Sequence, residues 1–407
     1  MEKIIVKGRS RLEGQVRVSG SKNAALPIIF ACLITDGISE IKGLPDIGDV
    51  RVALKILEWL GAQTERKGDV TFIDTRCVGY STPDHTLISR IRASTYLIGS
   101  CLSRFGKCEI LPYGGCNFAL RPIDMHISAC LALGADFDGK LLTAKELRGA
   151  VISFNKKSVG ATVNALLLSA CAEGETVIEG AATEPHIDAL ANFLVSAGAD
   201  IRRCNDCFYV KGGKLHGGKA TVIGDMIEAG SYLAAGLITE GKVRVTACPT
   251  DHMKSVFDCF SALGAKVTVC GDTAEAEMTD GGSFFSVNAA PYPGFPTDLQ
   301  PIMAPLMARY CGGKICDTVW RERFGYLKAI SKFGVKYSLC GSAAKISKSV
   351  LIPAVADAPD LRGGMACILC ALAAEGTGVI TSAKTVLRGY EDLTNKLCAL
   401  GAEIKIE

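Results

Sequence analysis

The chain has 407 residues, of which 48% are apolar and 21% are charged, so it is long and apolar enough for two or three folded domains and is not disordered. A net charge of +3 is too small to indicate a nucleic-acid or an anionic-membrane partner. No apolar run is long enough to span a bilayer.

The first residues predict a strand at Ile4 to Val6, with no basic and apolar leader before it. Most of the 18 cysteines lie in apolar helical or strand patterns, which favours reduced, buried thiols and a cytoplasmic location. Two CxxC spacings, at Cys204–Cys207 and Cys367–Cys370, have no second pair and no histidine beside them. We therefore expect no metal and no cofactor.

A repeat dominates the organisation of the chain. Six times a hydrophobic helix pattern ends in a glycine and a strand pattern follows, at intervals of 64 to 73 residues. These glycines are Gly61, Gly134, Gly198, Gly264, Gly334 and Gly401. Each is predicted to close a helix in the left-handed conformation. A second series of helix-ending glycines, in phase with the first, comprises Gly37, Gly106, Gly174, Gly241, Gly313 and Gly376. Such self-similarity marks an array of one supersecondary unit.

The helix patterns at 165–172 and 366–374 are almost fully apolar, which predicts helices buried inside and sheets outside. We expect an α/β fold of two halves with three repeats each. The first domain is predicted at residues 22–222, and the second at 1–21 plus 223–407, with the first strand completing the second half. The crevice between the halves is the expected ligand site.

Basic residues occur in turns that are predicted to open helices. One such cation is explained as a solvated helix end, but five in equivalent places favour a shared anion site. The five turns contain Lys22 with Asn23, Arg92, Lys156 with Ser158 and Val159, Arg362, and Arg388.

One turn of this kind, Phe295 to Asp298, is acidic instead. Thr297 or Asp298 as a helix N-cap is one interpretation, and a general base among the cations is the other.

The stretch from Leu111 to His126 has the strongest chemical character. Its Gly-Gly pair allows a tight loop that presents Cys116, and a nearby cation would favour the thiolate. Arg121, followed by Pro122, offers a planar fork suited to phosphate or carboxylate. A plain turn with a buried cysteine explains the stretch as well. The residues alone thus indicate a two-domain, anion-binding enzyme with a reactive cysteine.

Six motifs, in this order along the chain, resemble the UDP-N-acetylglucosamine 1-carboxyvinyltransferase family of enolpyruvyl transferases. They are Ser-Lys-Asn-Ala-Ala at 21–25, Gly-Gly-Cys with Arg-Pro-Ile-Asp-Met-His at 114–126, Ser-Val-Gly-Ala-Thr at 158–162, Phe-Pro-Thr-Asp at 295–298, Asp-Leu-Arg at 360–362 and Arg-Gly-Tyr-Glu at 388–391. The resemblance implies a two-domain inside-out α/β barrel of six repeated units, three per domain. It also implies transfer of the enolpyruvyl group of phosphoenolpyruvate to the 3′-hydroxyl of UDP-N-acetylglucosamine with release of phosphate, the first committed step of peptidoglycan synthesis.

The resemblance assigns roles residue by residue. Cys116 would be the proton donor and nucleophile, and Asp298 the general base. Phosphoenolpyruvate would be bound by Lys22, Asn23, Arg121, Arg323, Arg362 and Arg388. The nucleotide sugar would be bound by Asn23, Arg92, Arg121, Pro122, Ile123, Asp124, Met125, Lys156, Ser158, Val159, Asp298 and Val319. Both partners are small molecules, and no protein partner is indicated.

The chain departs from the family pattern at Phe118, Ala119, His186, Met226 and Trp320. These departures leave open a paralogue with another nucleotide-sugar acceptor. Two further alternatives are a catalytically silent UDP-sugar-binding protein and 5-enolpyruvylshikimate-3-phosphate synthase, which shares the barrel and the basic site. The last ranks lowest because that relative lacks the Gly-Gly-Cys loop.

Overall fold

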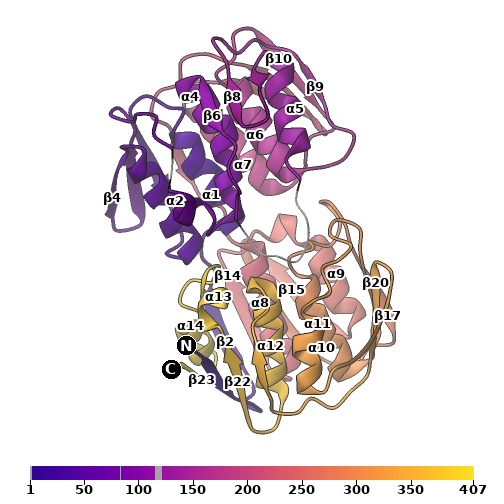
Figure 1. The fold of residues 1–407 in the computed structure, drawn as a ribbon. Helices are drawn as coiled ribbons and strands as arrows, with labels where there is room; N and C mark the ends of the chain where they lie inside the picture. The colour runs from indigo at the N-terminus through magenta and orange to yellow at the C-terminus, as the bar shows by residue number, and fades with distance from the viewer. Residues whose placement is uncertain (1, 83, 115–121) are drawn as a thin grey trace. The chain divides into compact units, whose positions relative to one another are not determined.

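The chain forms two compact domains in the computed structural model, which describes residues 2–82, 84–114 and 122–407 (Figure 1). The first domain contains residues 20–223 and the second contains residues 2–19 and 224–407, within the described ranges. Each domain has one hydrophobic core of its own. Among the described residues, every helix is too short or too polar to cross a membrane.

The first domain contains eight helical segments and eleven strands in its described part. The helices are α1 (Lys22–Cys32), α2 (Gly48–Trp59), α3 (His85–Ile88), the 3₁₀ helix η1 (Arg92–Tyr96), α4 (Leu97–Phe105), α5 (Asp124–Ala132), α6 (Val159–Ser169) and α7 (Pro185–Ser196). The strands are β3 (Ile38–Lys42), β4 (Gln63–Lys67), β5 (Val70–Asp74), β6 (Lys107–Glu109), β7 (Asp136–Phe137), β8 (Leu141–Thr143), β9 (Val151–Ser153), β10 (Glu175–Glu179), β11 (Asp200–Cys204), β12 (Cys207–Lys211) and β13 (Lys219–Thr221).

The second domain repeats this organisation. Its helices are α8 (Met226–Ile238), η2 (Thr250–His252), α9 (Lys254–Ala262), α10 (Gln300–Tyr310), α11 (Leu327–Ile330), η3 (Ser331–Phe333), α12 (Leu361–Ala373), α13 (Ala383–Leu387) and α14 (Leu393–Ala399). Its strands are β1 (Ile4–Lys7), β2 (Glu13–Arg17), β14 (Lys242–Thr246), β15 (Ala265–Cys270), β16 (Thr273–Met278), β17 (Phe285–Ala289), β18 (Gly313–Asp317), β19 (Lys336–Cys340), β20 (Ala343–Ser347), β21 (Val355–Asp357), β22 (Thr377–Thr381) and β23 (Glu403–Ile406).

Helices fill the interior of each domain, and sheets cover them. Every residue of α12 is buried, and α8 is buried except at Met226, because both helices are apolar at most positions and their charged residues, Arg362 and Glu228, form ion pairs. In the second domain α8, α10 and α12 pack against one another (Figure 1). The covering strands alternate instead, as in β14, where only Val243 and Val245 are buried. The inside-out α/β arrangement predicted from the sequence is confirmed.

Within the described ranges each domain has three sheets, one for each repeat. Five of the six combine a parallel pair at one edge with two antiparallel pairings, for example β13-β3-β5-β4 in the first domain. The sixth, β6-β8-β7, has three antiparallel strands in the described part of the chain. In the second domain β2 pairs with β14, and β1 lies between β22 and β23, where Val6 faces both Gly378 and Ile404.

The six glycines of the main repeat all adopt the predicted left-handed conformation, with φ between 91° and 111°. The second series is less uniform. At Gly241 and Gly313 the positive φ moves one residue earlier, to Glu240 and Gly312. Gly241 is required for another reason, because a Cβ there would lie 1.9 Å from the carbonyl oxygen of Leu12, where the chain enters the β2–β14 pair.

Candidate active site

Asp298 lies at the centre of a buried ionic cluster in the second domain. Its Oδ1 accepts a hydrogen bond from Arg323 Nη1 at 2.7 Å, and its Oδ2 accepts one from Arg362 Nη2 at 3.2 Å. The two arginine side chains are only 5% and 2% exposed, whereas that of Asp298 is 25% exposed. The carboxylate is therefore the part of the cluster that faces outward.

Asp298 does not cap a helix, so the N-cap interpretation of this turn is wrong. α10 begins at Gln300 with Leu299 as its N-cap, and no side-chain cap bond is made. Thr297 instead donates a hydrogen bond to Asp317 Oδ2 at 2.6 Å. Both side chains of the Thr-Asp pair are thus engaged by residues distant in the sequence.

Asp317, which ends β18, orients the next residues of the chain. Its Oδ1 accepts hydrogen bonds from the backbone N–H groups of Val319 and Trp320, at 2.9 and 2.7 Å. Asp317 is fully buried, and this bonding fixes the segment that contains the predicted sugar contact Val319. Asp317 was not predicted from the sequence, although an acidic residue at the end of a strand pattern was the available signal.

Arg362 enters the cluster from the start of α12. Asp360 caps this helix by accepting hydrogen bonds from the backbone N–H groups of Arg362 and Gly363, at 2.9 and 3.0 Å. The cap fixes the first turn, which places the Arg362 side chain in the interior. Its Nη1 is buried and makes no hydrogen bond within the described part of the chain.

Arg388 lies at the C-terminal end of α13, whereas the sequence pattern predicted that it opens the last helix. The error arose because α13 is short and α14 starts only at Leu393, after Asp392 in a left-handed conformation. Arg388 is half-buried, and Tyr390, two residues later, is fully buried.

Lys22 is the first residue of α1 in the first domain, after Ser21 at the N-cap position. Its Nζ lies 3.6 Å from Asp49 Oδ2, and the two side chains are 14% and 7% exposed. Asp49 belongs to the first turn of α2, where the helix dipole favours an acid. The sequence offered no local signal for this pair, because the partners belong to different helices.

The two lysines in the turn before α6 have different surroundings. Lys157 donates hydrogen bonds to Asp206 Oδ2 at 2.7 Å and to the Ala181 carbonyl at 3.0 Å, so it has a structural role. Lys156 is exposed. Ser158 is the N-cap, and its Oγ accepts a hydrogen bond from the Ala161 N–H at 3.4 Å, as expected for a helix start.

Arg92 opens η1, and Asp124 opens α5 at the end of the Arg-Pro-Ile-Asp motif. Both charges act on His126, whose pKa is lowered to about 4 by burial and by Arg92, against the opposing effect of Asp124. His126 is held by Asn164, whose Nδ2 lies 2.6 Å from the imidazole Nδ1. Arg92 and Asp124, two predicted sugar contacts, thus both lie close enough to His126 to shift its pKa. His126 was part of the quoted motif, but the sequence gave it no role.

The remaining predicted contacts of the first domain lie at exposed or half-buried positions. Asn23, Ile123, Met125 and Val159 are half-buried, and Pro122 is exposed. Cys116 and Arg121 lie outside the described residues, as do Phe118 and Ala119. The role of the Gly-Gly-Cys loop therefore remains a prediction.

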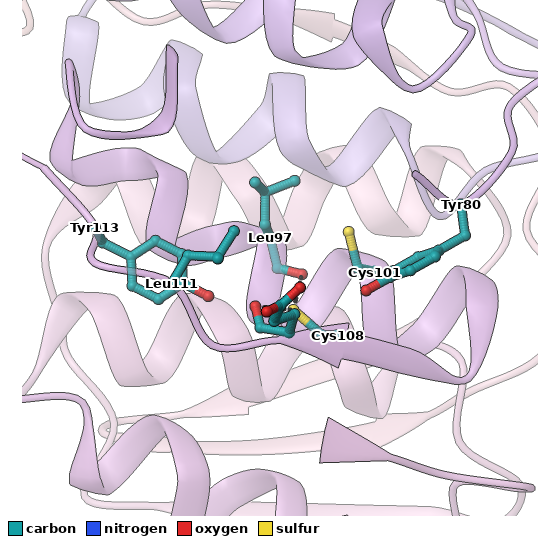
Figure 2. Close-up of a pocket in the computed structure, with 7 residues that line it drawn as sticks. Tyr80, Leu97, Cys101, Cys108, Leu111 and Tyr113 are labelled. Atoms are coloured by element: carbon teal, nitrogen blue, oxygen red, sulfur yellow. Dashed lines mark hydrogen bonds between the residues drawn. The ribbon is translucent and has the colours of Figure 1, made fainter. Parts of the chain in front are cut away.

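A small pocket of the first domain is lined by none of the predicted site residues (Figure 2). It is lined by Tyr80, Leu97, Cys101, Cys108, Glu109, Leu111 and Tyr113. A hydrogen bond with Cys108 and burial raise the pKa of Cys101 well above its usual value, so this thiol stays protonated and unreactive. The described residues also include no group of histidine, cysteine or acidic side chains suited to holding a metal ion.

Comparison with known proteins agrees with this arrangement. Residues 6–397 match the family model described as EPSP synthase (3-phosphoshikimate 1-carboxyvinyltransferase). The crystal structure of the enolpyruvyl transferase NikO from Streptomyces tendae superimposes with a TM-score of 0.89 at 25% identity, covering 100% of this chain and 98% of that one. EPSP synthase from Acinetobacter baumannii shares the fold, with a TM-score of 0.72 at 17% identity and coverage of 100% and 99%. The fold is thus that of the two-domain enolpyruvyl transferases.

Curated relatives narrow the assignment further. A Streptococcus mutans protein named UDP-N-acetylglucosamine 1-carboxyvinyltransferase 2 is 38% identical over 417 residues, covering 100% of this chain and 99% of that protein. A Caldanaerobacter subterraneus protein named UDP-N-acetylglucosamine 1-carboxyvinyltransferase 3 is 39% identical over 412 residues, with 99% of both chains covered. The chain belongs to the enolpyruvyl transferase family, in its UDP-N-acetylglucosamine 1-carboxyvinyltransferase branch, and the resemblance found in the sequence is confirmed.

Proposed function

We propose that this chain transfers the enolpyruvyl group of phosphoenolpyruvate to the 3′-hydroxyl of UDP-N-acetylglucosamine and releases phosphate, as a step of peptidoglycan synthesis. The observation that carries the proposal is identity of 38–39% over the full length with proteins named for this reaction. The proposal includes a cytoplasmic location, which agrees with the free thiols of all cysteines in the described part of the chain.

The donor carries a phosphate and a carboxylate, and both suit guanidinium groups. We assign its binding to Lys22, Asn23, Arg121, Arg323, Arg362 and Arg388. The buried Nη1 of Arg362, which makes no hydrogen bond in the described chain, supports this assignment, because a buried donor is costly unless it gains a partner.

The sugar nucleotide is assigned to the residues at the starts of η1, α5 and α6, and to Val319. Arg92, Lys156 and Ser158 supply cationic and hydroxyl groups there, and the helix N-termini favour an anion such as a diphosphate.

In the proposed chemistry, Cys116 protonates the methylene carbon of phosphoenolpyruvate, and the 3′-oxygen bonds to the adjacent carbon. Asp298 accepts the hydroxyl proton. The product forms when the new methyl group loses a proton and the C–O bond to phosphate breaks, so that phosphate leaves with its electron pair. The arginines beside Asp298 would stabilise the anionic intermediate.

The test is phosphate release from phosphoenolpyruvate, measured with and without UDP-N-acetylglucosamine. We expect release only when the sugar nucleotide is present. Shikimate 3-phosphate serves as the control acceptor, and we expect it to give no release. Release with shikimate 3-phosphate alone would favour the synthase alternative, and binding of the sugar nucleotide without release would favour the silent binding protein.

The cysteine assignment has its own test. An epoxide phosphonate that mimics phosphoenolpyruvate should alkylate Cys116, and Cys116→Ser should prevent the labelling. Peptide mapping by mass spectrometry identifies the labelled thiol. Cys101 and Cys108 provide an internal control because they are buried and should remain unlabelled. Labelling of another cysteine in the Cys116→Ser protein would contradict the assignment.

A further inference from the structure

Tyr390 connects three elements of the second domain. It lies two residues after Arg388, between α13 and α14, and is only 2% exposed. Its side chain contacts Ser231 of α8 and Arg362 of α12. Tyr390 belongs to the Arg-Gly-Tyr-Glu motif, but the sequence alone predicts no role for it.

The direction of the tyrosine hydroxyl follows from the hydrogen bonds around Ser231. Ser231 Oγ donates its proton to the Ile227 carbonyl at 2.7 Å. A serine hydroxyl has a single proton, so the Tyr390 hydroxyl is the donor in the 2.9 Å bond between Tyr390 Oη and Ser231 Oγ. Burial raises the pKa of the Tyr390 phenol, which keeps that proton in place at neutral pH.

The ring of Tyr390 supports the Arg362 guanidinium. The guanidinium carbon lies 5.4 Å from the ring centroid, within the range of a cation–π contact. Asp298 binds the same guanidinium through Nη2 at 3.2 Å. Arg362 is therefore restrained by a carboxylate and by an aromatic ring, and an arginine that is already restrained loses little freedom when it binds an anion.

The backbone around Tyr390 is restrained as well. A Cβ at Gly389 would lie 2.5 Å from Leu361 Cδ2, so the segment is in close contact with the residue before Arg362. On the other side, Ser19 Oγ donates a hydrogen bond to Glu391. Tyr390 is thus fixed by its side chain and by both neighbours in the chain.

We propose that Tyr390 is a positioning residue, which holds Arg362 through its ring and the neighbouring Arg388 through the short connecting backbone, so that both arginines are preset to bind the anionic donor. The inference rests on the proposed function, because it assumes that these arginines bind phosphoenolpyruvate. It concerns the donor alone and assigns Tyr390 no contact with the nucleotide sugar.

The experiment compares Tyr390→Leu, which removes the ring, with Tyr390→Phe, which keeps it. For Tyr390→Leu we expect the KM for phosphoenolpyruvate to rise about 10- to 30-fold, the size of a buried cation–π contact. The KM for UDP-N-acetylglucosamine should change by less than about twofold. Tyr390→Phe should keep the KM for phosphoenolpyruvate within about fivefold of the unsubstituted protein, because only a hydrogen bond is lost.

Tyr310 supplies a matched control in the same domain. Its hydroxyl donates a hydrogen bond to the Leu237 carbonyl at 2.5 Å, and the Arg309 guanidinium lies 5.7 Å from its ring centroid. It occupies the far end of α10 from Asp298, so Tyr310→Leu tests the loss of a tyrosine and a cation–π contact away from the site. We expect this variant to lower the melting temperature and to leave both KM values unchanged.

Two results would overturn the inference. One is an unchanged KM for phosphoenolpyruvate in a folded Tyr390→Leu protein, and the other is an equal rise for both substrates. If Tyr390→Leu fails to fold, the Tyr390→Phe/Ser231→Ala protein replaces it. This variant keeps the ring, so a rise of about 10- to 30-fold in its KM for phosphoenolpyruvate would contradict the ring's role.

Failure of the proposed function is recognised separately, because the unsubstituted protein would then release no phosphate. Calorimetric titration of the same variants with phosphoenolpyruvate still tests the positioning role in that case. Weaker binding by Tyr390→Leu alone supports it, and equal binding by all variants contradicts it.

Discussion

Several helix starts with predicted site residues have charges of opposite sign in the two domains, although α5 of the first domain begins at Asp124. In the second domain Asp225 and Asp360 are the N-caps of α8 and α12, and Asp298 lies two residues before α10 begins. In the first domain α1 and η1 begin at Lys22 and Arg92, and Lys156 precedes the N-cap of α6. One architecture is therefore combined with two different charge patterns.

The helix dipole explains only one of these patterns. Acids are favourable at helix N-termini, and Asp225 and Asp360 both cap their helices through two backbone N–H groups. Cations at helix N-termini are opposed by the dipole of their own helix, and Lys22 is stabilised instead by Asp49 of another helix. Asp298 also stands apart, because it binds two arginines instead of a helix end. Lys22, Arg92, Lys156 and Asp298, which depart from the dipole rule, are all assigned to substrate chemistry.

The largest change in turnover is expected at Asp298, and only a small one at the capping acid Asp360. Asp298→Asn removes the proton acceptor, so we expect phosphate release to slow by about 10²- to 10⁴-fold with both substrates still bound. Asp360→Asn keeps an oxygen that can cap α12 and should stay within about threefold of normal turnover. Steady-state phosphate release checks both variants, and near-normal turnover by Asp298→Asn would rule out the base role.

The charge of Lys22 is expected to contribute both to folding and to substrate binding, and two variants separate these contributions. Lys22→Met removes the cation that faces buried Asp49, so we expect a loss of about 3 kcal/mol in the free energy of unfolding, together with loss of turnover. Lys22→Met with Asp49→Asn should regain most of the stability but not the turnover. Urea unfolding and phosphate release measure the two quantities, and recovery of turnover by the double variant would contradict a binding role for Lys22.

A pH dependence is expected from His126 in the first domain. Its pKa in the folded protein, about 4, is below the ordinary value of 6.5, so the unfolded chain takes up the proton first as the pH falls. The stability contributed by neutral His126 is present above pH 6.5 and is lost as the pH falls toward 4, by roughly 3 kcal/mol in total. Urea unfolding at several pH values checks this. Replacement by glutamine should flatten the curve over the same range, and an equally steep curve would show that other groups are responsible.

The smallest effects concern the caps themselves. Asp360→Ala removes two cap bonds of 2.9 and 3.0 Å and should cost about 1–2 kcal/mol of unfolding free energy. Ser158→Ala removes one bond of 3.4 Å and should cost about 0.5 kcal/mol. The more informative quantity is turnover, since Ser158 is also assigned to the nucleotide sugar. A higher KM for UDP-N-acetylglucosamine in Ser158→Ala alone would sharpen the contrast between the domains.

The repeat and the layering were accessible from the sequence because they depend on local patterns. A glycine that closes a helix and a helix that is apolar on all sides are visible in short windows, as at Gly61 and at 366–374. The wrong prediction of a helix start at Arg388 also came from a local pattern. The pattern around Arg388 was assigned to the start of a helix, although the chain turns there through Asp392 before α14 begins.

The ionic cluster around Asp298 could not be predicted from local sequence patterns. Asp298 and Arg362 are 64 positions apart, and the pairing of Lys22 with Asp49 joins two helices. No periodicity encodes such contacts, because they depend on how the repeats pack together. The family resemblance supplied the identity of the charged residues, but it did not supply their mutual pairing or the role of Tyr390.

The position of β1 has a consequence for biosynthesis. β1 pairs with β22 and β23, and β2 pairs with β14, so the second domain needs strands from both ends of the chain. The first domain consists of residues that leave the ribosome before most of these partners exist. It can fold during translation, whereas the first 19 residues must wait for strands made more than 200 residues later. Until then β1 and β2 lack the strands that they pair with, and unpaired strands are places where chains can aggregate.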